Sequence, residues 1–161
     1  MEYEQAEQLV QRYGQTIYRL AYARTGSRED AEDITQETFL RLIRFNPEFK
    51  DENHRRAWLL RVAANCACNL FRAPWRRKNC PLEAAEQIAA ENSELENTGV
   101  LEAVLSLPED YRIPVHLFYY EGMSVAEIAQ ALGKREGAIR TRLFRARTML
   151  RDKLKEEGDY V

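Results

Sequence analysis

The sequence has little of what marks several large classes of protein. Seven glycines and five prolines in 161 residues are too few for a turn-dense all-β chain or a collagen-like repeat. No uninterrupted apolar run approaches the roughly 20 residues of a membrane span, and the acidic N-terminus MEYEQAEQLVQRYGQ is unlike a secretory signal. Three cysteines without a CxxC pair argue against a disulfide framework. These absences predict a cytoplasmic, mostly helical protein with no direct membrane insertion.

Motifs that carry catalysis or hold a cofactor are also missing. The chain contains no HExxH, GxSxG, Walker or GxGxxG sequence. His54 and His116 are far apart and have no carboxylate or cysteine cluster around them. Cys66 and Cys68 are two residues apart, about 200° around a helix, so they point to opposite faces and cannot share a metal. We therefore expect no enzyme activity, no metal and no cofactor.

Charge is unevenly distributed along the chain although the net charge is only −2. Residues 51–80 carry seven basic and two acidic side chains, whereas residues 81–111 carry eight acidic and no basic ones. Residues 134–155 carry nine basic and two acidic side chains. A solvated helix face usually mixes signs at i,i+4, so two cationic blocks separated by an acidic stretch favour a polyanion such as nucleic acid as the partner.

Apolar periodicity predicts an all-α fold of two small helical domains. A first helix ends near Gly26, and a second begins after the N-cap Ser27 and stops before Asn46. A polar loop at 50–54 then precedes a third helix, which Pro74 ends. We expect a first domain at 1–75, a second domain at 99–155 and a tail at 156–161. The segment at 76–98 is expected to be a flexible linker that contains at most a short helix, around 82–91.

The second domain contains the sharpest motif. Ser124 and Glu127 form a capping box, and Gly133 ends the short helix that follows. A tight turn leads into a longer helix whose apolar face, from Ile139 to Leu150, alternates with arginines on both flanks. A short helix, a tight turn and a basic second helix are typical of a helix-turn-helix, which lays its second helix in the major groove. Plain bundle packing is the alternative, and the one-sided arginine excess disfavours it.

Three runs of sequence resemble one family. DAEDITQETFLRLIR at 30–44 and RRAWLLRVAANCACNLFR at 55–72 are similar to region two of extracytoplasmic-function (ECF) sigma factors, the smallest members of the sigma-70 family. LPEDYRIPVHLFYYEGMSVAEIAQALGKREGAIRTRLFRARTMLRDKL at 107–154 is similar to region four. The runs occur in the family's order, with a variable linker between them. The resemblance implies a polymerase subunit without catalytic chemistry of its own.

The resemblance also implies roles for individual residues in region two. The acidic helix would bind the clamp coiled coil of the RNA polymerase core through Asp33, Gln36 and Glu37, all expected to be exposed. The third helix and its preceding loop would engage the −10 element as it opens, because a melted strand needs a cationic groove and a pocket for an extruded base. The residues assigned to this −10 site are Asn53, His54, Arg55, Arg56, Arg61, Asn65, Arg72, Arg76 and Arg77.

Region four would read the −35 element through the helix-turn-helix. Arg140, Thr141 and Arg142 stand where the family usually has Lys-Ser-Arg, and this departure leaves the preferred bases open. The residues assigned to the −35 site are Lys134, Arg135, Arg140, Thr141, Arg142, Arg145 and Arg147. The implied partners are the RNA polymerase core, through its clamp coiled coil and flap, promoter DNA and an anti-sigma factor. The alternative is a helix-turn-helix regulator that is not a polymerase subunit, but such a regulator needs no second cationic block.

Overall fold

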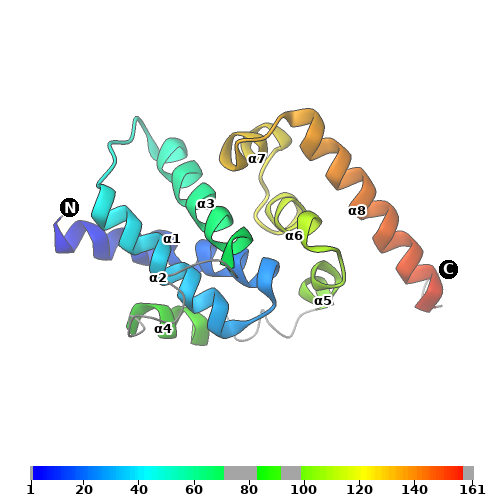
Figure 1. The fold of residues 1–161 in the computed structure, drawn as a ribbon, viewed down its shortest axis with the longest axis horizontal. Coiled ribbons are helices and arrows are strands. Elements are labelled where there is room, and N and C mark those ends of the chain that lie inside the picture. The colour runs from blue at the N-terminus through cyan, green and yellow to red at the C-terminus, as the bar shows by residue number, and fades with distance from the viewer. Residues whose placement is uncertain (1, 71–82, 92–98, 158–161) are drawn as a thin grey trace.

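The computed structural model describes residues 2–70, 83–91 and 99–157, and in this part of the chain all regular structure is helical (Figure 1). The first three helices are α1 (Tyr3–Thr25), α2 (Arg28–Phe45) and α3 (Glu52–Cys68), followed by α4 (Glu83–Glu91). The remaining helices are α5 (Gly99–Leu105), α6 (Glu109–Val115), α7 (Val125–Leu132) and α8 (Glu136–Glu157). The expected all-α class is confirmed.

Local capping signals set the ends of the first two helices where the sequence predicts them. Gly26 ends α1 in the left-handed conformation with φ 67°, a region that glycine enters without steric penalty. Ser27 accepts a hydrogen bond from the backbone N–H of Asp30 and so caps α2. Asn46 ends α2 with φ 41°. The chain therefore turns sharply twice, and α1, α2 and α3 pack into one bundle.

The start of α3 differs from the expected loop at 50–54. The Asp51 side chain accepts a hydrogen bond from the backbone N–H of His54 at 2.8 Å, so α3 begins at Glu52. An aspartate N-cap makes the following polar residues the first turn of a helix, which the lack of apolar residues there conceals. The end predicted at Pro74 lies outside the described residues, but α3 itself ends at Cys68.

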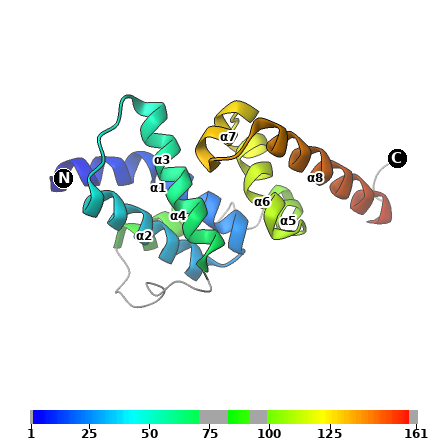
Figure 2. The ribbon, with the colours of Figure 1, turned by 45° about the horizontal axis from the view of Figure 1, so that its top comes forward.

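The helices form two units that pack against each other (Figures 1 and 2). The N-terminal unit comprises α1–α3 with α4, which lies against α1 and α2 through buried Ile88 and Ala89. Gly14 of α1, which has no Cβ, leaves room for the Ile88 side chain. The C-terminal unit comprises α5–α8. The predicted short helix around 82–91 is thus confirmed as α4, whereas its packing onto the bundle is not foreseeable from its weak apolar pattern.

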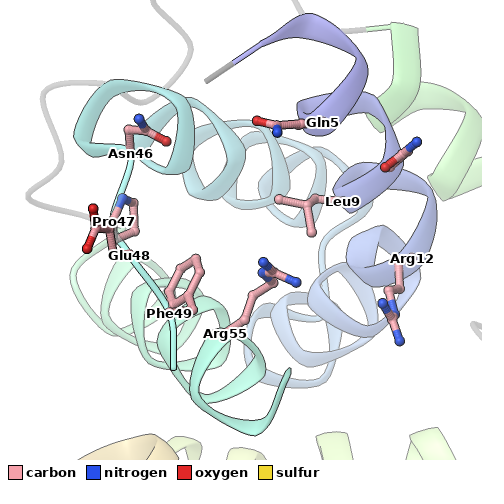
Figure 3. A pocket seen from close by; sticks show the side chains of 9 residues that line it. Gln5, Leu9, Arg12, Asn46, Pro47, Glu48, Phe49 and Arg55 are labelled. Carbon is pink, nitrogen blue, oxygen red and sulfur yellow. The ribbon is translucent and has the colours of Figure 1, made fainter. Parts of the chain in front are cut away.

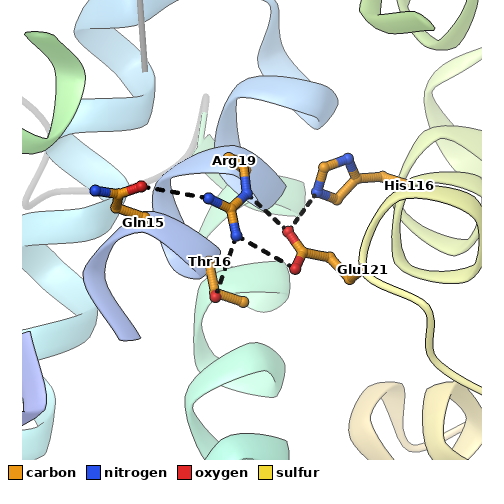
Figure 4. A network of polar contacts seen from close by, with 5 residues as sticks. All are labelled: Gln15, Thr16, Arg19, His116 and Glu121. Atoms are coloured by element: carbon orange, nitrogen blue, oxygen red, sulfur yellow. Dashed lines mark hydrogen bonds and ion pairs between the residues drawn. The ribbon is translucent and has the colours of Figure 1, made fainter. Parts of the chain in front are cut away.

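In the C-terminal unit, Pro114 lies inside α6 and a π-helical segment, His116–Tyr120, continues directly from it. Proline removes one backbone donor from a helix, and the wider π turn follows that interruption. The segment is closed by a hydrogen bond from the backbone N–H of Glu121 to the carbonyl of His116. This geometry sets the directions of His116 and Glu121, both of which face the N-terminal unit (Figure 4).

Candidate nucleic-acid interface

The helix-turn-helix of α7 and α8 is built by two local signals. The Ser124 side chain accepts from the backbone N–H of Glu127 at 3.1 Å, and the Glu127 carboxylate accepts from the backbone N–H of Ser124 at 3.0 Å. These bonds lower the pKa of Glu127. Gly133 ends α7 with φ 66°. The predicted capping box and glycine stop are both confirmed, and together they fix where α8 starts.

The apolar face of α8 packs into the unit and leaves its cationic side outside. Ile139, Leu143 and Ala146 are buried, as the helical periodicity predicts. Arg142 is half-buried, whereas the other residues assigned to the −35 site are exposed: Lys134, Arg135, Arg140, Thr141, Arg145 and Arg147. Exposed guanidinium groups along one helix can meet phosphates and the acceptor edge of guanine.

The partners of these side chains are weak or local. Arg140 is 64% exposed and lies 3.4 Å from Glu136, one turn earlier. Thr141 donates its hydroxyl to the carbonyl of Gly137 at 2.9 Å. Arg147 Nη1 lies 3.5 Å from the Tyr119 hydroxyl. Exposed pairs of this kind contribute little, so the cations of α8 remain available to an external anion.

Phe144 is a further candidate that the site assignment from sequence omits. It is 63% exposed on α8 among these cations. Large exposed apolar side chains at an interface can contact the methyl group of thymine in the major groove. Its outward position on the helical wheel, opposite Leu143 and Ala146, is the sequence signal that identifies it.

A pocket opens between α1, the segment that joins α2 to α3, and the first turn of α3 (Figure 3). Its volume is about 570 Å³. Its lining residues are Gln5, Gln8, Leu9, Arg12, Asn46, Pro47, Glu48, Phe49 and Arg55. Of these, sequence reasoning identifies only Arg55. The contribution of α1 depends on tertiary packing and has no local signal.

One carboxylate organises the rim of this pocket. Glu52 accepts a hydrogen bond from Tyr13 and pairs with Arg55, and it lies 3.4 Å from Arg12. The hydrogen bond from Tyr13 lowers the pKa of Glu52. The guanidinium of Arg55 also lies 5.3 Å from the centre of the Phe49 ring. The pocket therefore combines an aromatic face with two positioned cations, a combination suited to a base and its phosphate.

The other residues assigned to the −10 site are divided between two parts of α3. His54 is half-buried, accepts from the backbone N–H of Lys50 at 3.1 Å and stacks edge-on against Phe49, near the pocket. Asn53, Arg56 and Arg61 lie where α3 meets α7. Asn65 is exposed further along α3. Arg72, Arg76 and Arg77 lie outside the described residues.

The acidic face expected on α2 is less accessible than its sequence suggests. Asp33 is half-buried, Gln36 is 7% exposed and Glu37 is 5% exposed. Glu37 lies 3.4 Å from Arg41, one turn later. Every residue from Ile34 to Phe39 is buried, because α1, α3 and α4 all pack against α2. The predicted exposure of Gln36 and Glu37 is therefore wrong for this conformation.

The two cysteines of α3 lie as the helical wheel predicts. Cys66 is buried and Cys68 is exposed. Burial raises the pKa of the Cys66 thiol to about 11, so this thiol stays protonated at neutral pH. Among residues 2–70, 83–91 and 99–157 no group of histidine, cysteine and carboxylate side chains could hold a metal ion. In the same ranges no helix has the length and apolarity needed to cross a bilayer.

Comparison with known families matches two successive parts of the chain. A model described as Sigma-70 region 2 matches residues 9–77, and one described as Sigma-70, region 4 matches residues 99–150. The first match covers most of α1 with α2 and α3 but not α4, and the second covers α5 to α7 and most of α8.

Individual relatives and a solved structure agree. The chain is 35% identical over 157 residues to the ECF RNA polymerase sigma factor SigE of Mycolicibacterium smegmatis, covering 92% of this chain and 61% of that protein. It is 31% identical over 167 residues to the ECF RNA polymerase sigma-E factor of Haemophilus influenzae, covering 91% and 85%. The structure of CnrH in complex with the cytosolic domain of CnrY matches with a TM-score of 0.69 at 26% identity, over 99% of this chain and 92% of that one.

Proposed function

Because this chain belongs to the extracytoplasmic-function class of the sigma-70 family, we propose that it binds core RNA polymerase and directs initiation at promoters with a −10 and a −35 element. The observation that carries this proposal is the presence of two cationic helices, α3 and α8, in separate units of one chain. A regulator that reads one DNA site needs only the helix-turn-helix. The order of the two matched regions likewise favours a polymerase subunit over such a regulator.

Reading of the −35 element is proposed for α8. Its exposed cations surround its first two turns, and the N-terminal part of a recognition helix is the part that reaches base edges. Arg140 and Thr141 are the proposed base readers, with Phe144 as an apolar contact. Lys134, Arg135, Arg142, Arg145 and Arg147 are proposed to contact or steer the phosphate backbone.

Opening and reading of the −10 element are proposed for α3 and the pocket beside it. The pocket would take one extruded base against Phe49 while Arg12 and Arg55 neutralise the adjoining phosphates. The carboxylate of Glu52 would hold both guanidinium groups at the rim. Asn53, His54, Arg56, Arg61 and Asn65 would follow the strand along α3.

Binding of the clamp coiled coil of the polymerase is proposed for α2 through Asp33, Gln36 and Glu37. Since Gln36 and Glu37 are buried here, Asp33 is the most accessible member of this set, and the other two need a local rearrangement to reach a partner. The flap of the polymerase is proposed to contact the C-terminal unit.

Further properties are proposed from the family. The similar CnrH was solved with the cytosolic domain of CnrY, which supports a protein partner for this chain as well, and we propose an anti-sigma factor in that role. We also propose a cytoplasmic location, no catalytic step of its own, and domains at 1–75 and 99–155 joined by a linker at 76–98, whose helix α4 packs on the first domain.

The test is binding to purified core polymerase combined with run-off transcription from promoters selected by the reconstituted holoenzyme. We expect core binding and specific transcripts that require this chain. Asp33→Arg should weaken core binding, whereas Glu7→Arg, the same charge change at an exposed position of α1, should not. If the chain shifts −35 DNA without binding core, it is a regulator and not a polymerase subunit.

A further inference from the structure

Helix α3 and α7, the first helix of the helix-turn-helix, lie side by side (Figures 1 and 2). The −10 face of α3, which here means Asn53, Arg56 and Arg61, is the part that meets α7. Arg61 of α3 donates from Nε to the carbonyl of Ala131 at 3.0 Å and from Nη2 to the carbonyl of Gln130. These carbonyls belong to the last turn of α7, where the helix dipole favours a cation, and the Gln130 carbonyl otherwise accepts only a long bond of 3.4 Å from the backbone N–H of Gly133. Arg61 therefore acts as a C-terminal cap for a helix of the other unit.

Other residues assigned to the −10 site also face α7. A small cavity of about 60 Å³ lies at this contact, lined by Asn53, Arg56 and Ala57 of α3 and by Met123, Glu127 and Gln130 of the C-terminal unit. Hydrogen bonds with Ser124 are the main cause of the lowered pKa of Glu127, and the charge of Arg56 contributes to it. The C-terminal unit thus contacts the part of α3 that would follow a DNA strand, although Asn53 and Arg61 stay exposed and Arg56 is half-buried.

A second contact, away from the proposed DNA site, fastens the two units (Figure 4). Arg19 of α1 donates from Nε to Oε1 of Glu121 at 2.9 Å and from Nη2 to Oε2 at 3.3 Å. Both side chains are largely buried, with 18% and 8% exposure. Nε2 of His116 lies 3.4 Å from Oε1 of Glu121.

The electrostatics of this contact favour the ionised carboxylate. Burial acts to raise the pKa of Glu121, but the close approach of His116 Nε2 and the hydrogen bonds and charge of Arg19 outweigh it and lower the pKa to about 2. The Arg19 guanidinium also lies 5.4 Å from the centre of the Tyr120 ring. A two-point guanidinium–carboxylate pair in a buried position is specific in geometry, and breaking it leaves a charge without compensation.

We infer that the C-terminal unit masks the −10 face of the N-terminal unit in the free chain, with α7 and a DNA strand competing for Arg61, Arg56 and Asn53. The inference rests on the proposed function, because it assumes that α3 binds DNA. Arg61 already uses Nε and Nη2 on α7, so one of the donor pairs with which a guanidinium holds a phosphate is engaged. The Arg19–Glu121 pair holds the closed form, and the apparent affinity for a strand falls by the fraction of chains that are open.

The decisive variant is Arg19→Gln in the full chain. It removes a positive charge, so electrostatics alone predict weaker DNA binding, whereas release of α3 predicts stronger binding. The probe is a fluorescein-labelled, mixed-sequence single-stranded DNA of 20 nucleotides, followed by anisotropy at low salt. We expect its affinity to rise about three- to tenfold, in proportion to the gain in open chains. Arg28→Gln makes the same charge change at a surface pair on α2 and should lower the affinity slightly.

Opening is measured independently by energy transfer between dyes on Gln11→Cys and Asp152→Cys, two exposed positions, in a chain with its three native cysteines replaced. Transfer should change in Arg19→Gln but not in Arg28→Gln, with helicity by circular dichroism retained. Glu121→Gln removes the same pair from the other side and serves as the second variant if Arg19→Gln folds poorly.

The inference would be overturned if Arg19→Gln opens without binding the single-stranded DNA more tightly than Arg28→Gln. It would also be overturned if energy transfer is unchanged in both Arg19→Gln and Glu121→Gln. The proposed function fails by a different result, namely a wild-type chain that does not bind core polymerase or support run-off transcription. If the holoenzyme transcribes normally while Arg19→Gln and Glu121→Gln gain no affinity for single-stranded DNA, the masking is contradicted and the proposed function is left intact.

Discussion

The cations of α3 and those of α8 both belong to basic blocks of the sequence but have different neighbours in the fold. On α3, Arg55 is held by Glu52 and Phe49, and Arg61 is bonded to α7. On α8, Arg140 and Arg147 are exposed and meet only nearby side chains over 3.4–3.5 Å. Charge density along the chain therefore identifies both surfaces, but only the packing shows that Arg61 is bonded to the backbone of another helix whereas Arg140 pairs within its own helix.

This difference suggests an order of events for a chain that reads two promoter elements. A surface that is already exposed can meet duplex DNA without rearrangement, whereas α3 must first exchange the carbonyls of α7 for the strand. Under the proposed function, α3 meets melted DNA only after the polymerase is in place, so its engagement by α7 would limit binding of other nucleic acid before then. The following predictions test whether this contrast between α3 and α8 holds.

The largest effect is expected from Glu121, because its pair with Arg19 is the contact proposed to keep α3 against α7. Without this pair α3 and α8 would no longer differ in accessibility. The pKa of Glu121 is about 2 in the folded chain against a usual 4.5, which corresponds to about 3 kcal/mol of stabilisation. Because the pKa is lowered on folding, this contribution is fully present above pH 4.5 and is lost as the pH falls towards 2. Urea unfolding should show Glu121→Gln less stable than wild type at pH 6, with the difference shrinking across that range.

The control for this measurement is Glu102→Gln, which changes an exposed carboxylate on α5. It should follow wild type at every pH. A constant difference between wild type and Glu121→Gln from pH 6 to pH 2.5 would show that ionisation of this carboxylate is not the source of the stability.

The next effect concerns the open surface. Replacing Arg140 by Ala should relax selectivity at one −35 position by about 1–3 kcal/mol, because a bidentate arginine–guanine contact discriminates among bases. Replacing Arg147 by Ala should weaken all sequences alike and make the salt dependence shallower, as loss of a phosphate contact does. The measurement is binding of both full-length variants to a panel of −35 duplexes over a salt series. Unchanged affinity in both would contradict the docking of α8.

A smaller effect is expected from the cap of α7, the helix that covers α3. Ser124→Ala removes the side-chain acceptor for the backbone N–H of Glu127 and should destabilise the chain by about 1 kcal/mol. Thermal unfolding measures the change, and Ser124→Asp, which can also accept this bond, should restore most of it. If Asp fails to rescue, the capping box is not the source of the stability.

The smallest change compares two faces of α3 itself. Cys68 is exposed, whereas Cys66 is buried with its pKa raised to about 11. Iodoacetamide at pH 8 should therefore alkylate Cys68 well before Cys66, because the thiolate is the reactive form. Peptide mass spectrometry over time measures both rates, with urea-unfolded protein as the control in which the two rates converge. Equal rates in the folded chain would contradict the orientation of α3.

Features that depend on a few neighbouring residues are predicted well from the sequence. The capping box of Ser124 and Glu127, the stop at Gly133 and the cap at Ser27 each involve bonds within four residues. The outward positions of the arginines of α8 follow from a rotation of 100° per residue once Ile139 is taken as buried. The start of α3 is the local exception, because Asp51 caps a turn that lacks apolar residues.

Features that depend on distant segments are not predicted. Gln36 and Glu37 look like a polar surface in sequence, but they are buried because three helices pack around α2. Arg12 and Tyr13 meet Glu52 across 40 and 39 positions, and no spacing rule connects them. Of the residues that line the pocket they border, the sequence therefore predicts only Arg55.

The sequence by itself determined the helices, their caps, the two cationic blocks and the family, because each of these is written in local periodicity, hydrogen bonding within a turn, or composition. The tertiary structure alone decided which cations are free, because a guanidinium group is satisfied by whatever acceptor the fold brings within reach. For Arg61 that acceptor is the carboxyl end of α7, 69 and 70 residues away in the chain. For Arg140 it is a glutamate one turn earlier on the same helix, which leaves the side chain in solvent.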